Sequence, residues 1–384
     1  MAGLGLVFPY QSLYLRENAG LTGAELGAVL AVRPFVGMLA QPLWGQLADR
    51  SGSRSRVLGA AALGSAAAYA VFPLAQGFLP LLFAMAAVAV FSTSVIPMST
   101  SVTLAALGAD APRSFGRVRV WGTVGFLLLV AGFPPLLHAA QRGLGWVRAS
   151  GGPSEPGLAM LFGLAALLSF AAALLALRVR GSGARGARAE RGELRLLLRH
   201  PPYRRALVYA FLAWLLLQGP ILLFPVFVRE IGGDLDTVSR MWLPMLALEI
   251  PLVLYSGAAL GRLGSRGLVA IGVLADGLRW TICALVPELP VVFAAQLLHG
   301  VSIAGLAVGI QLYVESVVPE QLRSSGQGLL ATLGPSIGGI LSSAGAGVLL
   351  DGFGARAPCL VGGLGALALG CLTWLLLPPP ARPR

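Results

Sequence analysis

The stretch Gly45-Gln-Leu-Ala-Asp49-Arg50-Ser-Gly52-Ser-Arg54-Ser-Arg56 directly follows the second apolar run of the chain. A related stretch, Gly257-Ala-Ala-Leu-Gly261-Arg262-Leu-Gly264-Ser-Arg266, begins 212 positions later, after another apolar run. Glycines let two helix ends approach closely, and arginines hold a loop at the face of a membrane. One short basic loop is therefore used twice, which indicates two copies of one structural unit.

The composition agrees with a membrane protein. Of 384 residues, 56% are hydrophobic and only 11% are charged, which excludes an ordinary soluble domain. An apolar run of about 20 residues crosses the ~30 Å hydrocarbon core as a helix. We expect twelve such helices, of which the first is short: 1–15, 26–47, 57–75, 79–107, 118–140, 158–179, 206–228, 241–260, 268–286, 291–318, 328–350 and 359–377.

The distribution of charge predicts the orientation. The net charge is +12 and all 28 cationic residues are arginine, a balance that can also indicate a nucleic-acid partner. Twenty of these arginines fall in alternate loops and only six in the other loops, while Arg33 and Arg279 lie inside apolar runs. Arginine-rich loops stay in the cytoplasm. We therefore expect a lipid bilayer and not a nucleic acid as partner, with both chain ends in the cytoplasm.

The chain divides near its middle. We expect one helical bundle over 1–177, a cytoplasmic linker over 178–205 and a second bundle over 206–384. The linker mixes leucines with arginines, so it either lies on the inner membrane surface or is a solvated connection. A second pair of matching strings, Arg113-Ser-Phe-Gly116-Arg117 and Arg323-Ser-Ser-Gly326-Gln327, supports two tandem bundles.

The GxxxDRxGxR pattern of the first loop resembles the signature of the major facilitator superfamily, whose two halves each carry a copy after their second helix. The resemblance implies an all-α membrane protein with twelve transmembrane helices in two pseudo-symmetric six-helix bundles. A cavity near the midplane would open to alternate sides. The gating residues would be Gly45, Asp49, Arg50, Gly52 and Arg54. Because the second copy carries Gly261 in place of Asp49, we expect the gating charge pair mainly in the first half.

Four ionisable residues lie in apolar runs of the second half: Glu249, Asp276, Arg279 and His299. A charge in hydrocarbon costs at least ~2.5 kcal/mol, so each is a candidate functional residue. Alternatives remain open for each. Asp276 and Arg279, three residues apart, could form only a local ion pair, and His299 could be a satisfied core residue. Arg33 in the first half could attract an anion in the cavity or extend to the headgroups.

Several strings resemble, in order, segments of the lactose permease branch of proton-coupled symporters. They are Pro9-Tyr10, Gln41-Pro-Leu-Trp-Gly45, Phe115-Gly-Arg117-Val-Arg119-Val-Trp-Gly122-Thr-Val-Gly125-Phe126 and Leu298-His299. The phenylpropionate and nucleoside permease-like branch is a closer match, through Glu249-Ile-Pro, Leu278-Arg279-Trp280 and Gln296-Leu-Leu-His299. These resemblances imply two sets of site residues. Arg119, Phe126, Arg279, Gln296 and His299 would bind substrate, and Glu249, Asp276 and His299 would couple transport to protons.

The chain departs from the lactose permease pattern at three points. The sugar-binding acid of the fourth helix would fall near Thr100 or Ser101, so lactose-type recognition is not expected. The proton-carrying acid one turn after the histidine is Ser302 here, so Glu249 must carry the proton. Residues 1–15 correspond to the last two-thirds of a first helix, so we expect a truncated chain or a misplaced start codon.

We therefore predict a monomeric secondary transporter of the inner membrane. It would move an aromatic carboxylate, nucleoside or sugar-like solute by proton symport with alternating access. A proton-coupled drug or metabolite exporter and a non-transporting sensor on the same fold are the alternatives. An enzyme is not expected, because the chain has no HExxH motif and no phosphate loop. Cys283, Cys359 and Cys371 lack paired spacing, so neither a disulfide, a metal nor another cofactor is expected.

Overall fold

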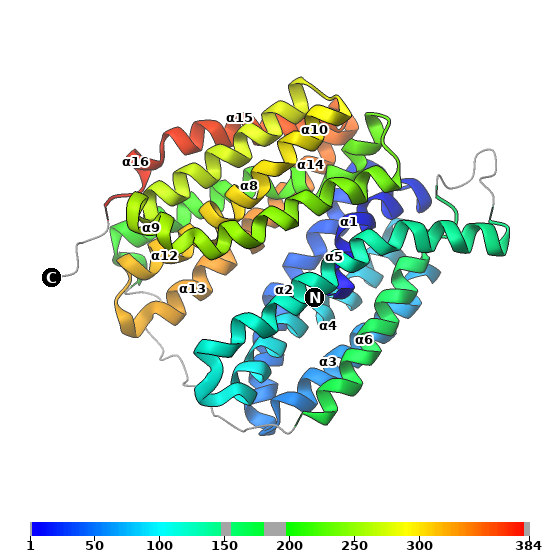
Figure 1. The fold of residues 1–384 in the computed structure, drawn as a ribbon, viewed down its shortest axis with the longest axis horizontal. Coiled ribbons are helices and arrows are strands. Elements are labelled where there is room, and N and C mark those ends of the chain that lie inside the picture. The colour runs from blue at the N-terminus through cyan, green and yellow to red at the C-terminus, as the bar shows by residue number, and fades with distance from the viewer. Residues whose placement is uncertain (1, 147–154, 180–196, 380–384) are drawn as a thin grey trace. The chain divides into compact units, whose positions relative to one another are not determined.

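The computed structural model describes residues 2–146, 155–179 and 197–379, and these residues form helices and no β-strand. They separate into two compact units, Met1–Ala187 and Arg188–Arg384 (Figure 1). Most of the expected linker 178–205 lies outside the described residues. The first long helix of the second unit begins at Pro201, earlier than the apolar run from 206, because Pro201 and Pro202 start a helix well and the first turn need not be apolar.

The described part of the first unit contains six α-helices. Its α2 begins with a capping box, in which Thr22 and Glu25 bond reciprocally to each other's backbone N–H groups at 2.9 and 3.3 Å. Neighbouring helices are α2 with α4, α3 with α6, and α1 with α5. The six helices are α1 (Ala2–Leu13), α2 (Gly23–Ser51), α3 (Arg54–Val71), α4 (Phe78–Leu107), α5 (Ala111–Leu144) and α6 (Met160–Arg178).

The described part of the second unit also contains six helical spans, several of them interrupted. They are α8 (Pro201–Glu230); the two halves of α9 (Leu235–Leu285); a span made of α10 (Leu289–Ala295), η4 (Gln296–Leu298), α11 (His299–Ser302), η5 (Ile303–Val308) and α12 (Gly309–Val317); a span made of α13 (Arg323–Ala331), η7 (Thr332–Gly338) and α14 (Gly339–Phe353); and α15 (Arg356–Cys371), continued by α16 (Thr373–Leu376). The letters Gly-Pro-Ser336-Ile-Gly match the GxSxG string of hydrolases, but they lie in the π-helical η7 and not at a strand-to-helix turn.

In both units the repeated loop contains a glycine with a positive φ. Gly52 ends α2 with φ of 65°, and Gly264 divides α9 with φ of 68°. Residues with a Cβ rarely adopt these angles, so each copy needs glycine at this position. The break at Gly264 turns α9 into two helices.

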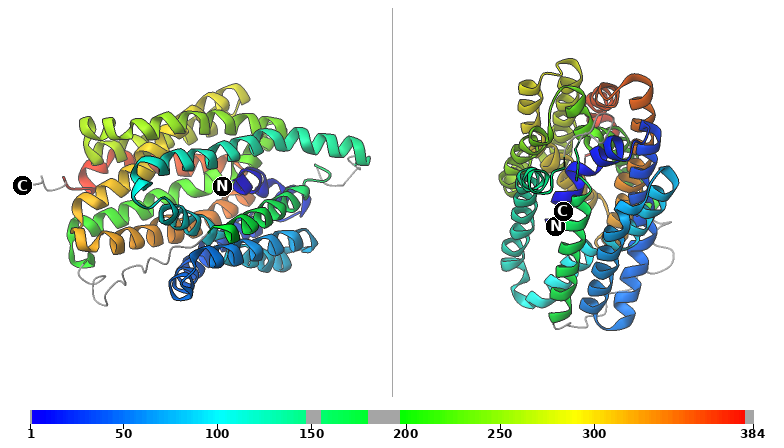
Figure 2. Two further views of the ribbon diagram at one scale, coloured as in Figure 1. Left: turned by 60° about the horizontal axis from the view of Figure 1, so that its bottom comes forward. Right: turned by 90° about the vertical axis from the view of Figure 1, so that its right-hand side faces the viewer.

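The helices suit a bilayer. Nine helices of the described residues are long and apolar enough to cross a membrane. Many large apolar side chains are exposed, among them Leu43, Leu74, Phe83 and Phe353, as expected where hydrocarbon is the solvent. Within each unit the helices run largely side by side (Figure 2). The all-α membrane fold predicted from the sequence is confirmed.

Candidate functional site

A close contact between two helices of the second unit sets the position of the buried charges. The second half of α9 and the span Leu289–Val317 run in opposite directions and meet backbone to backbone. A Cβ on Gly305 would lie only 2.4 Å from Cα of Gly272, so the contact leaves no room for a side chain there. Counting seven residues forward from Gly272 and seven back from Gly305 places Arg279 opposite Leu298. The Arg279 side chain therefore reaches both Gln296 and His299.

The first half of α9 reaches the same region. A Cβ on Gly300 would lie 3.0 Å from the backbone nitrogen of Glu249, so the absence of a side chain at Gly300 allows this approach. Oε2 of Glu249 then lies 3.9 Å from Nε2 of the neighbouring His299. Three stretches of chain thus bring together the four ionisable residues that the sequence singled out in the second half.

Arg279 is the centre of this charged cluster, which we define as Glu249, Asp276, Arg279, Gln296 and His299. Its Nη1 donates to Oδ1 of Asp276 at 2.9 Å and to Nδ1 of His299 at 2.7 Å, and its Nε donates to Oε1 of Gln296 at 3.0 Å. The local ion pair of Asp276 and Arg279, left open by the sequence, is present.

The Arg279 side chain is only 1% exposed, and its Cζ lies 4.1 Å from the ring centroid of Trp280. Its Nη2 is buried and has no hydrogen-bond partner among the described residues. A buried donor without a partner costs about 1 to 3 kcal/mol. The charged cluster therefore holds one donor that a bound group could satisfy.

The contact with Arg279 fixes the tautomer of His299. A guanidinium can only donate, so Nδ1 of His299 accepts and the proton of the neutral ring resides on Nε2, the atom that faces Glu249. The Glu249 side chain is 31% exposed and that of His299 12%. The three side chains therefore form an ordered series, from the more exposed Glu249 through His299 to the buried Arg279.

Two members of the surroundings were missed by the sequence reasoning. Trp280 lies against the guanidinium of Arg279, and Sγ of Cys283 accepts from Nε2 of Gln296 at 3.4 Å. Gln296 Nε2 also donates to the carbonyl of Val292, which fixes the amide with its oxygen toward Arg279. For Cys283 a signal was present in the sequence, because the spacing of 276, 279 and 283 places these three residues on one helix face.

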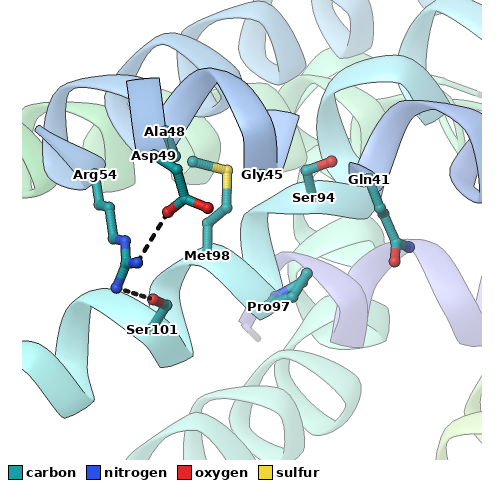
Figure 3. A pocket seen from close by; sticks show the side chains of 9 residues that line it. All are labelled: Gln41, Gly45, Ala48, Asp49, Arg54, Ser94, Pro97, Met98 and Ser101. Carbon is teal, nitrogen blue, oxygen red and sulfur yellow. Dashed lines mark hydrogen bonds and ion pairs between the residues drawn. The ribbon is translucent and has the colours of Figure 1, made fainter. Parts of the chain in front are cut away.

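Three of the predicted gating residues, Gly45, Asp49 and Arg54, line a cavity in the first unit (Figure 3). Nη2 of Arg54 forms an ion pair with Oδ1 of Asp49 at 2.9 Å, and Nη1 of Arg54 donates to Oγ of Ser101 at 3.3 Å. The contact with Ser101 was not foreseen. Arg50 is exposed, and Gly52 forms the C-cap of α2. The cavity, of about 390 Å³, is lined by Gln41, Gly45, Ala48, Asp49, Arg54, Ser94, Pro97, Met98 and Ser101.

In the second copy of the loop, the arginine has a different hydrogen-bond acceptor. Arg266 corresponds to Arg54, and its Nη2 donates to the backbone carbonyl of Trp374 at 2.8 Å. The residue corresponding to Asp49 is Gly261, which offers no side-chain acceptor. A carbonyl after the last long helix thus replaces the carboxylate as the partner of this arginine.

Arg119 and Phe126 lie on α5 of the first unit, two helical turns apart and therefore on one face. The Arg119 side chain is exposed, and no hydrogen-bond or ion-pair partner for it is found in the part of the chain that the structure describes. The charged cluster belongs to the other unit. A ligand shared by Arg119, Phe126 and the charged cluster stays a prediction.

No group of three or more His, Cys, Asp or Glu residues within 2–146, 155–179 and 197–379 is placed to hold a metal ion. The side chains of the charged cluster offer hydrogen bonding, charge pairing and proton exchange, which are elements of solute recognition.

Comparison with known proteins gives a consistent picture. The model of the MFS_1 like family matches residues 1–359. A maltose permease of Geobacillus stearothermophilus is 29% identical over 354 residues, which cover 90% of this chain and 84% of the relative. The putative nucleoside transporter YegT of Escherichia coli is 27% identical over 356 residues, covering 87% and 78%. The crystal structure of the nucleoside transporter NupG superposes with a TM-score of 0.83 at 16% identity, covering 98% of this chain and 95% of that one.

Proposed function

Because the chain belongs to the MFS_1 like family of major facilitator membrane transporters, we propose that it carries a neutral nucleoside- or sugar-like solute across the membrane in symport with protons. The observation that carries this proposal is the charged cluster around Arg279, with its unused buried donor and its neighbouring carboxylate at Glu249.

The charge balance of the cluster favours a neutral solute. Asp276 lies 2.9 Å from Arg279 and compensates its charge, so the pair offers no surplus positive charge to a carboxylate. The Nη2 of Arg279 and the amide of Gln296 suit hydroxyl and carbonyl oxygens of a solute. By their names, the relatives above act on maltose and on nucleosides, both of which carry a hydroxylated sugar. Within the predicted range of solutes we therefore prefer the nucleoside or sugar-like members over an aromatic carboxylate.

The tautomer of His299 supports Glu249 as the coupling acid. A second proton on its ring would occupy Nδ1 and break the contact with Arg279, so the cluster resists protonation at that site while the contact persists. Glu249 can accept a proton without disturbing Arg279. A neutral Glu249 costs less to bury than a carboxylate, so the protein loaded with proton and solute can close and later release both.

We further propose the topology expected from the arginine count, with a monomer in the inner membrane and both chain ends in the cytoplasm. Single cysteines introduced at Ser154 and Ser182, which lie outside the described residues, can be labelled with an impermeant thiol reagent in intact cells after replacement of Cys371. Only position 154 should react from outside. Labelling of position 182 from outside would contradict the proposed orientation.

Solute binding to the purified protein tests the substrate class. Uridine, adenosine, maltose and 3-phenylpropionate are titrated separately by calorimetry in detergent. We expect a nucleoside or maltose to bind, and phenylpropionate not to displace it at the same concentrations. If only the carboxylate binds, the proposed charge balance is wrong.

The same assay tests Arg119. Arg119→Lys keeps the charge but removes the planar fork of donors, so it should weaken binding by about 1 to 3 kcal/mol, or roughly 5- to 150-fold. Arg142→Lys, an exposed arginine that donates to the carbonyl of His138 in its own helix, is the matched control. Equal affinities in both variants would remove Arg119 from the binding site.

A further inference from the structure

We infer that the first unit contains a second ligand site, which binds a small monocarboxylate around Arg33. This inference does not depend on the proposed transport function. A half-open cavity of about 170 Å³ lies in the first unit, and its lining comes from α1, α2, α3, α4 and α6. The lining includes the polar residues Arg33, Ser65, Tyr69, Ser92 and Ser169.

Arg33 is a cation without a protein partner among the described residues, which offer it no ion pair or hydrogen bond. It lies ten residues into α2, or about 15 Å along the helix, which is far from the end of a span that must cross ~30 Å of hydrocarbon. Because Arg33 lines a cavity between the helices of the first unit, we favour the anion-attracting role left open by the sequence over extension to the headgroups. An uncompensated charge at this depth calls for an anion.

Two hydroxyls of the lining point to the same conclusion. Ser65 is only 1% exposed, and Oγ of both Ser65 and Ser92 is buried with no hydrogen-bond partner among the described residues. A helical Ser or Thr in an apolar setting usually bonds to a carbonyl of its own helix. Thr93 and Ser99 on α4 do so, with Ala89 and Ile96. The hydroxyls of Ser65 and Ser92 are therefore able to donate to a ligand.

The lining defines the ligand class. One uncompensated guanidinium and several hydroxyl donors match the single charge and two oxygens of a carboxylate. The remaining walls are apolar, including Leu4, Val95 and Leu168, and none of the described residues that line the cavity is acidic. A cavity of about 150 Å³ is known to hold benzene. A ligand with a single apolar ring therefore fits this volume.

Benzoate and its neutral isostere benzamide are the probes. Each is titrated into the purified full-length protein in detergent, and both binding heat and melting temperature are recorded. Benzoate should bind and raise the melting temperature, while benzamide should bind at least tenfold more weakly. Arg33→Gln should abolish the preference for benzoate, whereas the control Arg142→Gln should keep it.

Ser65→Ala gives a second, independent readout. It removes a buried hydroxyl that has no partner among the described residues, so the ligand-free variant should melt at the same or a higher temperature, yet bind benzoate at least fivefold more weakly. Ser99→Ala, which removes a hydroxyl bonded within α4, should leave benzoate affinity unchanged. Equal binding of benzoate and benzamide, or unchanged benzoate affinity in Arg33→Gln, would overturn the inference. If Arg33→Gln does not fold, unchanged affinity in Ser65→Ala would overturn it.

Discussion

Nη1 of Arg279 donates to Nδ1 of His299 across 2.7 Å, although the two residues are 20 positions apart in the sequence. This contact leaves the ring proton of His299 on Nε2, toward Glu249. The histidine thus has two different tasks, one on each ring nitrogen. Its Nδ1 accepts from the guanidinium of Arg279, and its Nε2 lies 3.9 Å from Oε2 of Glu249.

Amide substitutions separate these two tasks. The amide of Asn occupies the position of Nδ1 and that of Gln the position of Nε2. His299→Asn should therefore keep solute affinity within about threefold, because Arg279 keeps its acceptor. His299→Gln should weaken binding roughly 10- to 150-fold, which corresponds to a charged hydrogen bond of about 1.5 to 3 kcal/mol. Calorimetric titration measures both, and the reverse ranking would contradict the assigned tautomer.

The close contact of Gly272 with Gly305 is the basis of the register that brings Arg279 to Gln296 and His299. In Gly305→Ala the new Cβ would lie 2.4 Å from a backbone atom, so the two helices must separate. We expect a loss of stability of about 1 to 3 kcal/mol and a loss of solute binding.

Gly261→Ala is the control for this substitution. Nothing lies within 4 Å of a Cβ at this position, so the change should be neutral or slightly stabilising. Thermal unfolding in detergent checks the pair, and equal melting temperatures would argue against a tight helix contact.

The sequence predicted the membrane fold well because a bilayer imposes strong constraints: long apolar runs, basic inner loops and a repeated glycine turn. It located the intramembrane charges for the same reason, since each departs from an apolar background. It could not predict the helix register. That register depends on which glycines of two distant segments meet, and the pairing of Gly272 with Gly305 has no local signal in either segment.

The first-unit ion pair of Asp49 and Arg54 is exposed at 49% and 20% of the two side chains, so it should contribute at most about 1 kcal/mol to stability. If this ion pair has a gating role, its loss should change the rate of transport and not the stability. Asp49→Asn should leave the melting temperature unchanged but slow transport at least tenfold, because the loop loses its charge pair. Asp110→Asn, just after the end of α4, is the control. Normal transport by Asp49→Asn would refute the gating assignment.

The two copies of this loop also show where sequence reasoning stops. The replacement of Asp49 by Gly261 was visible in the sequence, and it removes the acidic side chain from the second copy. The substitute partner was not visible, because a backbone carbonyl at Trp374, 108 positions from Arg266, can be supplied by any residue type. The same applies to Ser65 and Ser92, whose hydroxyls are informative only because they lack partners among the described residues.

Asp234 caps the first half of α9 outside the membrane. Its Oδ1 accepts from both the hydroxyl and the N–H of Thr237, at 2.5 and 2.7 Å, and the hydroxyl bond is the main reason that the pKa of Asp234 is lowered. An acid with a lowered folded pKa stabilises the protein above its ordinary pKa of about 4, and this contribution is lost as the pH falls through the folded pKa.

Asp234→Ala should therefore cost about 1 kcal/mol at pH 7, the typical value of an N-cap, and progressively less below about pH 4. Asp234→Asn, which keeps a capping oxygen, should lose little at either pH. Melting curves of the three proteins across this pH range give the comparison. A constant difference between wild type and Asp234→Ala at all pH values would show that the charge is not involved.

Glu249→Gln tests the assignment of the coupling acid, because Gln resembles the protonated side chain and cannot release a proton. Exchange of labelled for unlabelled solute should continue, within about threefold of the wild-type rate. Accumulation against a gradient should be lost. Glu288→Gln, a residue just before the start of α10, is the matched control and should accumulate solute normally. Accumulation by Glu249→Gln would place the coupling acid elsewhere.

The most direct measurement is uptake of a labelled nucleoside by the purified wild-type protein in proteoliposomes, with the lumen at pH 8 and the medium at pH 6. Proton symport predicts accumulation above the external concentration, and collapse of that accumulation when a protonophore is added. Uptake that stops at equal concentrations with and without the pH gradient would contradict proton symport.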